Sequence, residues 1–247
     1  MKPIALVTGG TRGIGRAITV DLARKGYHVL ALYARNRKAA ESLQEEAKKE
    51  KLSVETLRGD LTDQAKIKGL LSDIKARHPK INVVVHNAAS GVHRPVEELT
   101  AKHIRWTYEI NVLAAHELIM GLLDYFNEDA RIIGITSSGG THVIPYYAAV
   151  GSSKGALESL FRHYAAELAP RKIAVNLVCP GMVMTEAIEA FPDRNERVEN
   201  CLRDTPTRKL TEADEVADLV SFLATSRAGS QIIGQTFRID GGRCIKS

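Results

Sequence analysis

Short apolar segments alternate with longer amphipathic segments along almost the whole chain. The apolar segments are the predicted strands, and they lie at residues 4–7, 28–32, 54–57, 81–85, 131–135, 173–178 and 237–239. The amphipathic segments are the predicted helices, and they lie at residues 13–25, 36–51, 62–78, 100–125 and 152–168, with one more before the last strand. Strands that alternate with helices in this way are typical of βαβ units, in which the strands run parallel.

The predicted strands are apolar at nearly every position rather than at every second position. This pattern is typical of a parallel sheet that helices cover on both faces. The chain has 247 residues, a length that single α/β domains reach, and neither an internal repeat nor a linker divides it. The sequence therefore predicts one α/β domain over residues 1–247, with a central parallel sheet of about seven strands between two layers of helices.

One segment departs from this regular alternation. Residues 185–210 are rich in charged side chains, contain Pro192 and Pro206, and follow the predicted strand at 173–178. Ligands bind outside the carboxyl ends of the strands in open α/β sheets, and loops at this place commonly carry function. We therefore predict that residues 185–210 form a lid over a substrate.

Composition narrows the class of protein. Hydrophobic residues make up 44% of the chain and charged residues 26%, as in ordinary globular proteins. No apolar run approaches the roughly 18 residues that span a bilayer, so we expect a cytoplasmic protein without a membrane partner. The net charge of +5 is spread along the chain rather than gathered in a block, so we expect no nucleic-acid partner.

The cysteines and histidines indicate neither disulfide bonds nor a metal site. Cys179, Cys201 and Cys244 are odd in number and widely spaced, and they form no C-x-x-C pattern. The histidines, among them His142 and His163, do not follow metal-ligand spacing either. We therefore expect free thiols and no bound metal.

A glycine-rich turn follows the first predicted strand and opens the first predicted helix. Its sequence over residues 8–15 is TGGTRGIG. Glycines let the backbone turn tightly and approach a pyrophosphate, whose negative charge the N–H groups and dipole of a helix N-terminus favour. The spacing differs from the common G-x-G-x-x-G fingerprint, and a purely structural turn is the alternative. The residues of this turn that we expect at a dinucleotide cofactor are Gly9, Thr11, Arg12, Gly13, Ile14 and Gly15.

The end of the second predicted strand indicates which dinucleotide is bound. An acidic residue there would hydrogen-bond the 2′-hydroxyl of NAD, but residues 33–38 read YARNRK and contain no acid. Guanidinium groups bind a 2′-phosphate through charge-assisted, bidentate hydrogen bonds. Arg35, Asn36 and Arg37, with Arg12 nearby, therefore favour NADPH, and the alternative is a solvated basic start of the next helix.

Motifs spread over the whole chain resemble those of the short-chain dehydrogenase/reductase family. They are the turn at residues 8–15 and, further along, Asn87-Ala88-Ala89, Asn111, Ser137, Lys154, Pro180-Gly181 and Asp240-Gly241-Gly242. The resemblance implies a Rossmann-type fold and a homotetramer. The further cofactor contacts that it implies are made by Asp60, Leu61, Asn87, Ala88, Lys154, Pro180, Gly181 and Thr185.

The tyrosine of the family pattern is displaced in this chain. It usually lies four residues before the lysine, where this chain has Val150, whereas Tyr147 lies seven residues before Lys154. The longer spacing is similar to that of the enoyl-acyl-carrier-protein reductases, and residues 87–92 and 234–236 resemble their NADPH-dependent type III, or FabL type. This resemblance implies reduction of trans-2-enoyl thioesters carried on acyl carrier protein, in fatty acid biosynthesis.

The chemistry of the two reactions explains why the spacing matters. A ketoreductase donates a proton to the oxygen of the carbon that takes the hydride. An enoyl reductase sends hydride to the β-carbon, and the charge appears on the more distant thioester oxygen, where a phenol donor stabilises it. A shift of the tyrosine from four to seven residues before the lysine keeps it on one helical face and adds about 4.5 Å of rise if the segment is helical.

The candidate catalytic residues are Tyr147, Lys154, Ser137 and Asn111. Tyr147 is the expected hydrogen-bond donor, with the adjacent Tyr146 as the alternative. The resemblance implies that Lys154 binds the nicotinamide ribose and that Asn111 organises a water molecule near the lysine. Ser137 would polarise a substrate carbonyl in a ketoreductase, and its alternative is a structural hydrogen bond at a strand end.

Two other functions are compatible with the sequence. A reductase of 3-oxoacyl thioesters or other carbonyls would share the fold and the cofactor, although Val150 argues against it. A non-catalytic NADPH-binding protein would not require the retained Lys154 and Tyr147.

An acyl carrier protein, as an acidic partner, would need a basic surface on the enzyme. The residues that we expect to form this basic rim are Arg171, Lys172, Arg194 and Arg197.

Overall fold

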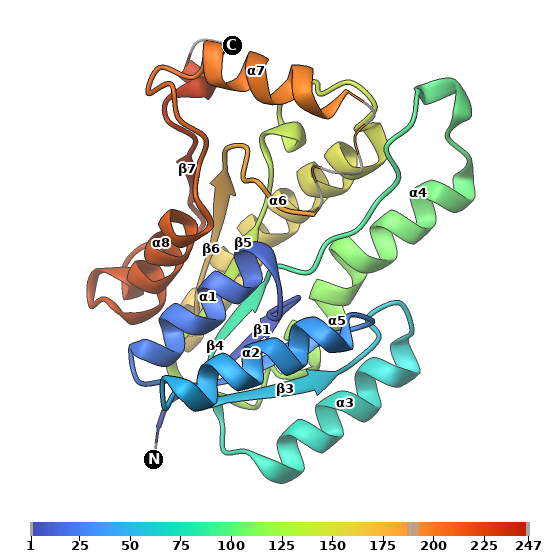
Figure 1. Cartoon of the computed structure of the whole chain (residues 1–247). Helices are drawn as coiled ribbons and strands as arrows, with labels where there is room; N and C mark the ends of the chain where they lie inside the picture. The colour runs from blue at the N-terminus through green and yellow to red at the C-terminus, as the bar shows by residue number, and fades with distance from the viewer. Residues whose placement is uncertain (1, 187, 189–190, 192, 246–247) are drawn as a thin grey trace.

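The computed structural model describes residues 2–186, 188, 191 and 193–245. Within these residues, seven parallel strands form one central sheet in the order β3-β2-β1-β4-β5-β6-β7 (Figure 1). The strands are β1 (Ile4–Thr8), β2 (His28–Tyr33), β3 (Val54–Arg58), β4 (Ile81–His86), β5 (Phe126–Ile135), β6 (Ala174–Pro180) and β7 (Thr236–Ile239). The predicted α/β fold with a seven-stranded parallel sheet is confirmed.

Helices cover both faces of this sheet. Side chains of α3, α5 and α6 share one buried cluster with the strands, and side chains of α1 and α8 share the cluster on the other face. The α-helices are α1 (Gly13–Arg24), α2 (Arg37–Lys49), α3 (Gln64–Arg77), α4 (Ala101–Tyr108), α5 (Ala114–Gly121), α6 (Ala148–Leu168), α7 (Arg194–Asp204) and α8 (Ala213–Thr225). None of the helices in the described part of the chain is long and apolar enough to cross a membrane.

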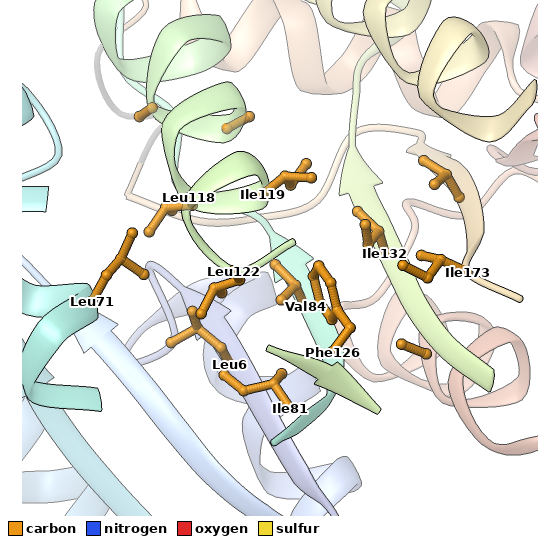
Figure 2. Close-up of a cluster of buried hydrophobic side chains, with 14 of the residues drawn as sticks. Leu6, Leu71, Ile81, Val84, Leu118, Ile119, Leu122, Phe126, Ile132 and Ile173 are labelled. Carbon is orange, nitrogen blue, oxygen red and sulfur yellow. The ribbon is translucent and has the colours of Figure 1, made fainter. Parts of the chain in front are cut away.

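Successive strand residues contribute to opposite sides of the core, which explains why the strands are apolar throughout. Leu6 on β1 pairs in register with Val84 on β4, and both belong to the cluster that Figure 2 shows beside Leu118 of α5. The next residues, Val7 and Val85, belong to the other cluster. Because both faces are packed in this way, the carboxyl ends of the strands are held in fixed positions.

The predicted helix at 100–125 is wrong in its interior and at its end. The structure has α4, then a π-helical turn at Glu109–Leu113, then α5, which ends at Gly121. The strand β5 begins at Phe126 rather than at residue 131, and the apolar pattern did not predict this start because residues 127–129 are polar. Single π-helical turns occur frequently at functional sites, and this one contains the candidate residue Asn111.

The order of the strands creates a place for a ligand. The chain passes from β1 to β2 on one side of β1 and returns to β4 on its other side. In open α/β sheets the crevice outside the carboxyl ends of the strands, at such a reversal, is the usual binding site. Figure 1 shows α7 beyond the carboxyl end of β6, on this same side of the sheet.

Candidate functional site

A crevice of about 1340 Å³ opens at the carboxyl ends of the strands. Small-molecule pockets typically measure about 300–1,000 Å³, so this crevice has room for a dinucleotide and a second molecule. Most residues that the sequence predicts at the cofactor line it: Gly9, Thr11, Arg12, Gly13, Ile14, Arg35, Asn36, Asp60, Leu61, Asn87, Ala88, Lys154, Pro180, Gly181 and Thr185.

The glycine turn after β1 has the backbone shape that a pyrophosphate requires. Gly9 (φ +64°) and Gly13 (φ +50°) adopt left-handed conformations that favour glycine. The Nδ2 of Asn87 fixes the turn by donating to the carbonyl oxygens of Thr8 (3.0 Å) and Gly9 (3.2 Å). Gly15 lies outside the crevice lining of the described residues, but a Cβ there would lie 2.1 Å from the carbonyl oxygen of Gly9. Gly15 therefore allows α1 to pack against the turn.

Two of the three predicted arginines face the crevice. Arg35 lines it, and so does Arg12, whose guanidinium contacts the carboxylate of Glu186. Arg37 is instead paired with Glu41 at 2.7 Å, one turn along α2, and is outside the lining of the described residues. A 2′-phosphate in the crevice would therefore meet Arg12 and Arg35.

Asn36 and Asp60 use their side chains within their own loops. The Oδ1 of Asn36 accepts a hydrogen bond from a backbone N–H of α2 and so caps this helix. The carboxylate of Asp60 accepts hydrogen bonds from the Thr62 hydroxyl (2.7 Å) and the Lys66 ammonium (2.9 Å). These bonds, that of Thr62 above all, lower the pKa of Asp60 to about 2. Asp60 is therefore an ionised acceptor in the crevice wall at neutral pH.

The candidate lysine is buried in the crevice wall. Lys154, on α6, is 4% exposed, and its Nζ donates to the carbonyl oxygen of Ile135 at 2.8 Å. Burial lowers the pKa of Lys154 to about 8, because the charged form is less stable away from water. At neutral pH the side chain is thus mainly an ammonium, and this hydrogen bond uses one of its three donors.

Tyr147 is the candidate phenol in the same crevice as this lysine. It directly precedes the first residue of α6, and it lines the crevice together with Ser137. Burial raises the pKa of Tyr147, while the hydrogen bond with the Ser137 side chain acts in the opposite direction. The phenol is therefore protonated at neutral pH and is able to donate. Tyr146 is 41% exposed and lies outside the lining of the described residues.

Position 150, where the family pattern has its tyrosine, is part of the packed interior. Val150 is 5% exposed and lies outside the crevice lining of the described residues. Its Cγ2 fills the space beside Gly91, since a Cβ on that glycine would lie 2.1 Å from it. A phenol at position 150 would therefore collide with the loop after β4.

Asn111 lies behind the crevice rather than in its wall. Its Oδ1 accepts a hydrogen bond from the backbone N–H of Ser90 at 2.9 Å, and its Nδ2 donates to the Ser153 hydroxyl at 2.8 Å. Its carbonyl oxygen lies 3.3 Å from Nε2 of His86, whose pKa burial lowers to about 3. Asn111 thus joins the loop after β4 to the residue next to Lys154, which makes it a positioning residue.

The sequence reasoning missed an aromatic wall, which consists of His93, Phe191 and Tyr147. The ring of His93 stacks on that of Tyr147, with the ring centroids 5.5 Å apart. The ring centroid of Phe191 lies 4.2 Å from that of His93 and 6.1 Å from that of Tyr147. Burial, and then the charge of Arg197, lower the pKa of His93, so its imidazole is neutral at pH 7. Neither residue type nor spacing marked His93; its place in the loop after β4 is the signal that could have found it.

The predicted lid contributes to the crevice wall through α7. Arg197 of this helix lies over the ring of Phe191, 4.4 Å from its centroid, and donates to the carbonyl oxygen of Pro145 at 3.0 Å. Residues 187, 189, 190 and 192, which belong to the predicted lid, lie outside the described residues.

The four residues predicted as a basic rim do not lie together. Arg194 begins α7, and the side chain of Arg197 is only 13% exposed within the crevice. Arg171 and Lys172 precede the amino end of β6, at the opposite end of the sheet, where each pairs with an acidic side chain. The arginines that line the crevice are Arg12, Arg35, Arg197, Arg203 and Arg243.

Comparison with known proteins identifies the family. Residues 9–243 match the family model described as Enoyl-(Acyl carrier protein) reductase. The chain is 30% identical over 246 residues to 3-oxoacyl-[acyl-carrier-protein] reductase FabG of Staphylococcus aureus, with 98% of each chain covered. The chain belongs to the short-chain dehydrogenase/reductase family. Its structure also matches a short chain dehydrogenase from Burkholderia cenocepacia in complex with NADP, with a TM-score of 0.90, 27% identity and 98% of each chain covered.

Another relative of this short-chain dehydrogenase/reductase is named for a substrate other than that of FabG. The chain is 30% identical over 250 residues to 1-cyclohexenylcarbonyl-CoA reductase of Streptomyces collinus, covering 99% of this chain and 88% of that protein. Family membership therefore establishes an oxidoreductase, while the choice of substrate rests on the geometry of the crevice.

Proposed function

We propose that this short-chain dehydrogenase/reductase uses NADPH to reduce the trans-2 double bond of enoyl thioesters carried on acyl carrier protein, in fatty acid biosynthesis. The observation that carries the proposal is the placement of the tyrosine. The phenol of Tyr147 lines the same crevice as Lys154, whereas the buried Val150 fills the position that a ketoreductase uses.

The chemistry of a conjugated thioester matches this arrangement. Bound NADPH supplies a hydride to the β-carbon, and the electron pair of the double bond moves toward the thioester oxygen. The phenol of Tyr147, kept protonated by burial, donates a hydrogen bond to this oxygen. The ammonium of Lys154 adds positive charge on the same side, and the α-carbon of the resulting enolate then takes up a proton from solvent.

The crevice wall near Tyr147 suits an acyl chain. The apolar and aromatic side chains of the crevice lining include Trp106, Ile110, Ile144 and Phe191, and the ring of Phe191 stacks near that of Tyr147. A wall of this kind excludes water, which strengthens the hydrogen bond from Tyr147 to a developing charge. The neutral imidazole of His93 belongs to this wall rather than to the proton-transfer groups.

The choice of NADPH rests on Arg12 and Arg35. Both line the crevice near the end of β2, where the sequence has no acid that would bind the 2′-hydroxyl of NAD. The similar structure from Burkholderia cenocepacia holds NADP, which supports the same assignment here.

Arg35→Glu should raise the KM for NADPH by about 10–100-fold, because a charge-assisted hydrogen bond to the 2′-phosphate is lost, and should not raise that for NADH, since an acid at this place favours the 2′-hydroxyl. Arg37→Glu is the matched control, since Arg37 is paired with Glu41 along α2. Steady-state kinetics with both dinucleotides measure the effect. Equal changes in the two variants would contradict the assignment to Arg35.

The substrate proposal is tested by NADPH oxidation with a trans-2-enoyl thioester and, separately, with a 3-oxoacyl thioester, both on acyl carrier protein. We expect turnover with the enoyl substrate alone. Turnover with the 3-oxoacyl substrate alone would replace the proposal by a ketoreductase, and no turnover with either would favour a non-catalytic NADPH-binding protein.

A 3-oxoacyl reductase is the second candidate function. The similarity to FabG of Staphylococcus aureus favours it, and so does Ser137, which lines the crevice next to Tyr147. In this alternative Ser137 would polarise the ketone, and Tyr147 would donate its proton from an unusual position.

The acidic carrier would approach the crevice from the side of α7. Arg203 lines the crevice there and its side chain is 67% exposed. Added salt should therefore raise the KM for the carrier-bound substrate but not that for a small neutral thioester, because salt screens exposed charges. An equal response of both substrates would argue against electrostatic docking.

We also propose a homotetramer, which light scattering would test.

A further inference from the structure

Three side chains with metal-binding atoms meet at the amino end of the sheet, away from the crevice. His28 is the first residue of β2, Glu55 is the second residue of β3, and His78 directly follows α3. The candidate ligand atoms of the three residues all lie within 4.8 Å of one another. We propose that His28, Glu55 and His78 form a binding site for a divalent transition-metal ion of the Zn²⁺ type.

The spacing of the ligand atoms fits one shared ion. The Oε2 of Glu55 lies 3.3 Å from Nε2 of His78 and 3.7 Å from Nε2 of His28. Zinc binds nitrogen and oxygen ligands at about 2.0–2.2 Å in tetrahedral geometry, which places two ligand atoms about 3.3–3.6 Å apart. Two imidazoles and a carboxylate are a ligand set that zinc accepts, and water would complete its coordination.

The hydrogen bonds around the site leave the required nitrogen atoms available. Nδ1 of His28 lies 2.9 Å from the Ser53 hydroxyl, so the ring is held with Nε2 toward Glu55. Nε2 of His78 is buried, and its close acceptor Oε2 of Glu55 is not aligned for a hydrogen bond, so among the described residues this nitrogen has no hydrogen-bond partner and is available to a metal ion.

Arg77 is the charged neighbour of the site. Its guanidinium contacts Oε1 of Glu55, whereas both histidines face Oε2. Arg77 therefore orients the carboxylate as an outer hydrogen-bond partner, and its positive charge lowers the affinity for a cation. We expect binding weaker than that of a structural site with four protein ligands.

The ion would join three elements that are separate in the sequence. His28, Glu55 and His78 belong to β2, β3 and the end of α3, so the site forms only in the folded protein. A ligand that binds the folded chain alone stabilises it. The crevice lies at the opposite ends of the same strands, so the ion would affect stability and not turnover.

The experiment uses the full chain after removal of metal with a chelator, with Zn²⁺ and Co²⁺ as probes. We expect one Zn²⁺ per chain by calorimetry, and a Tm higher by about 5 °C or more at 100-fold excess over the Kd. Co²⁺ should bind in competition with Zn²⁺ and show the visible absorption of an ion with nitrogen and oxygen ligands. No change in Tm and no Co²⁺ absorption in the wild-type chain would overturn the proposal.

Substitutions of the two proposed histidine ligands test where the ion binds. His28→Gln and His78→Gln should each weaken Zn²⁺ binding at least about tenfold and abolish the Co²⁺ absorption. His163→Gln, which changes an exposed histidine of α6, should bind as the wild type does. The metal-free Tm of each variant shows whether it is folded. Wild-type affinity in folded His28→Gln and His78→Gln variants would place the ion elsewhere and refute the site.

Discussion

Tyr147→Phe should lower kcat for enoyl reduction by about 10²–10³-fold and leave NADPH binding unchanged. The substitution removes one hydroxyl from a phenol that lines the same crevice as Lys154. A single donor aimed at a developing oxyanion commonly contributes this much to the rate. The aromatic ring stays in place, so the packing against His93 and Phe191 is kept. The measurement is single-turnover reduction at saturating NADPH, with the affinity for NADPH taken from fluorescence titration.

Tyr146→Phe is the matched control for this prediction. Tyr146 is the adjacent tyrosine, it is 41% exposed, and it lies outside the crevice lining of the described residues. We expect this variant to reduce the substrate at the wild-type rate. If Tyr146→Phe were the inactive variant and Tyr147→Phe the active one, the phenol that meets the substrate would have been misassigned.

Lys154→Met should lower kcat/KM by about 10²-fold or more and should at the same time stabilise the protein without cofactor. The ammonium is fully buried, and its pKa of about 8 lies well below the ordinary value for lysine. A shift of this size corresponds to about 3 kcal/mol of unfavourable burial at neutral pH. Methionine has a similar length and carries no charge, so this unfavourable contribution disappears together with the activity.

The pH dependence gives the same residue a second test. Lys154 loses its proton in the folded chain above pH 8, so reduction should fall about tenfold for each further pH unit. In the unfolded chain the same group titrates near its ordinary pKa of about 10.4. Between these two values the unfolded state binds more protons at this group, so Lys154 should make the free energy of unfolding of the wild type rise with pH relative to that of Lys154→Met.

Urea unfolding at several pH values, together with the pH profile of kcat/KM, checks both statements. The stability advantage of Lys154→Met over the wild type should shrink between pH 8 and about 10. Lys102→Met, at an exposed position of α4, should behave as the wild type does in both measurements. A Lys154→Met variant that is less stable than the wild type at pH 7 would show that the charge is not buried unfavourably.

The sequence was sufficient for the sheet, and most of the residues that it predicts at a cofactor line the crevice. Continuous apolar strands alternate with amphipathic helices, and these local patterns predict the parallel sheet without any long-range information. The glycine turn was also readable, because left-handed backbone at Gly9 and Gly13 needs glycine whatever surrounds it. The interruption and end of the predicted helix at 100–125 were not readable, since a π-helical turn and an early start of β5 leave no periodic signal.

Side-chain partners were the part that the sequence did not predict. Arg35 and Arg37 look equivalent in sequence, but only Arg35 lines the crevice, because Arg37 pairs with Glu41 along α2. Likewise Asn111 matches a family motif, but its two hydrogen bonds to Ser90 and Ser153 place it behind the crevice. These partners depend on the direction in which each side chain points, and the linear sequence does not show that direction.

By itself, the sequence determined the α/β sheet, the dinucleotide turn and the spacing between Tyr147 and Lys154. These features depend on residue type and on distances along one or two elements, so they are visible in a linear pattern. Only the tertiary structure decided that Val150 is packed against Gly91, that His93 stacks on Tyr147, and that His28 meets Glu55 and His78. These contacts join residues far apart in the chain, and the packing of the sheet and helices, rather than local preference, brings them together.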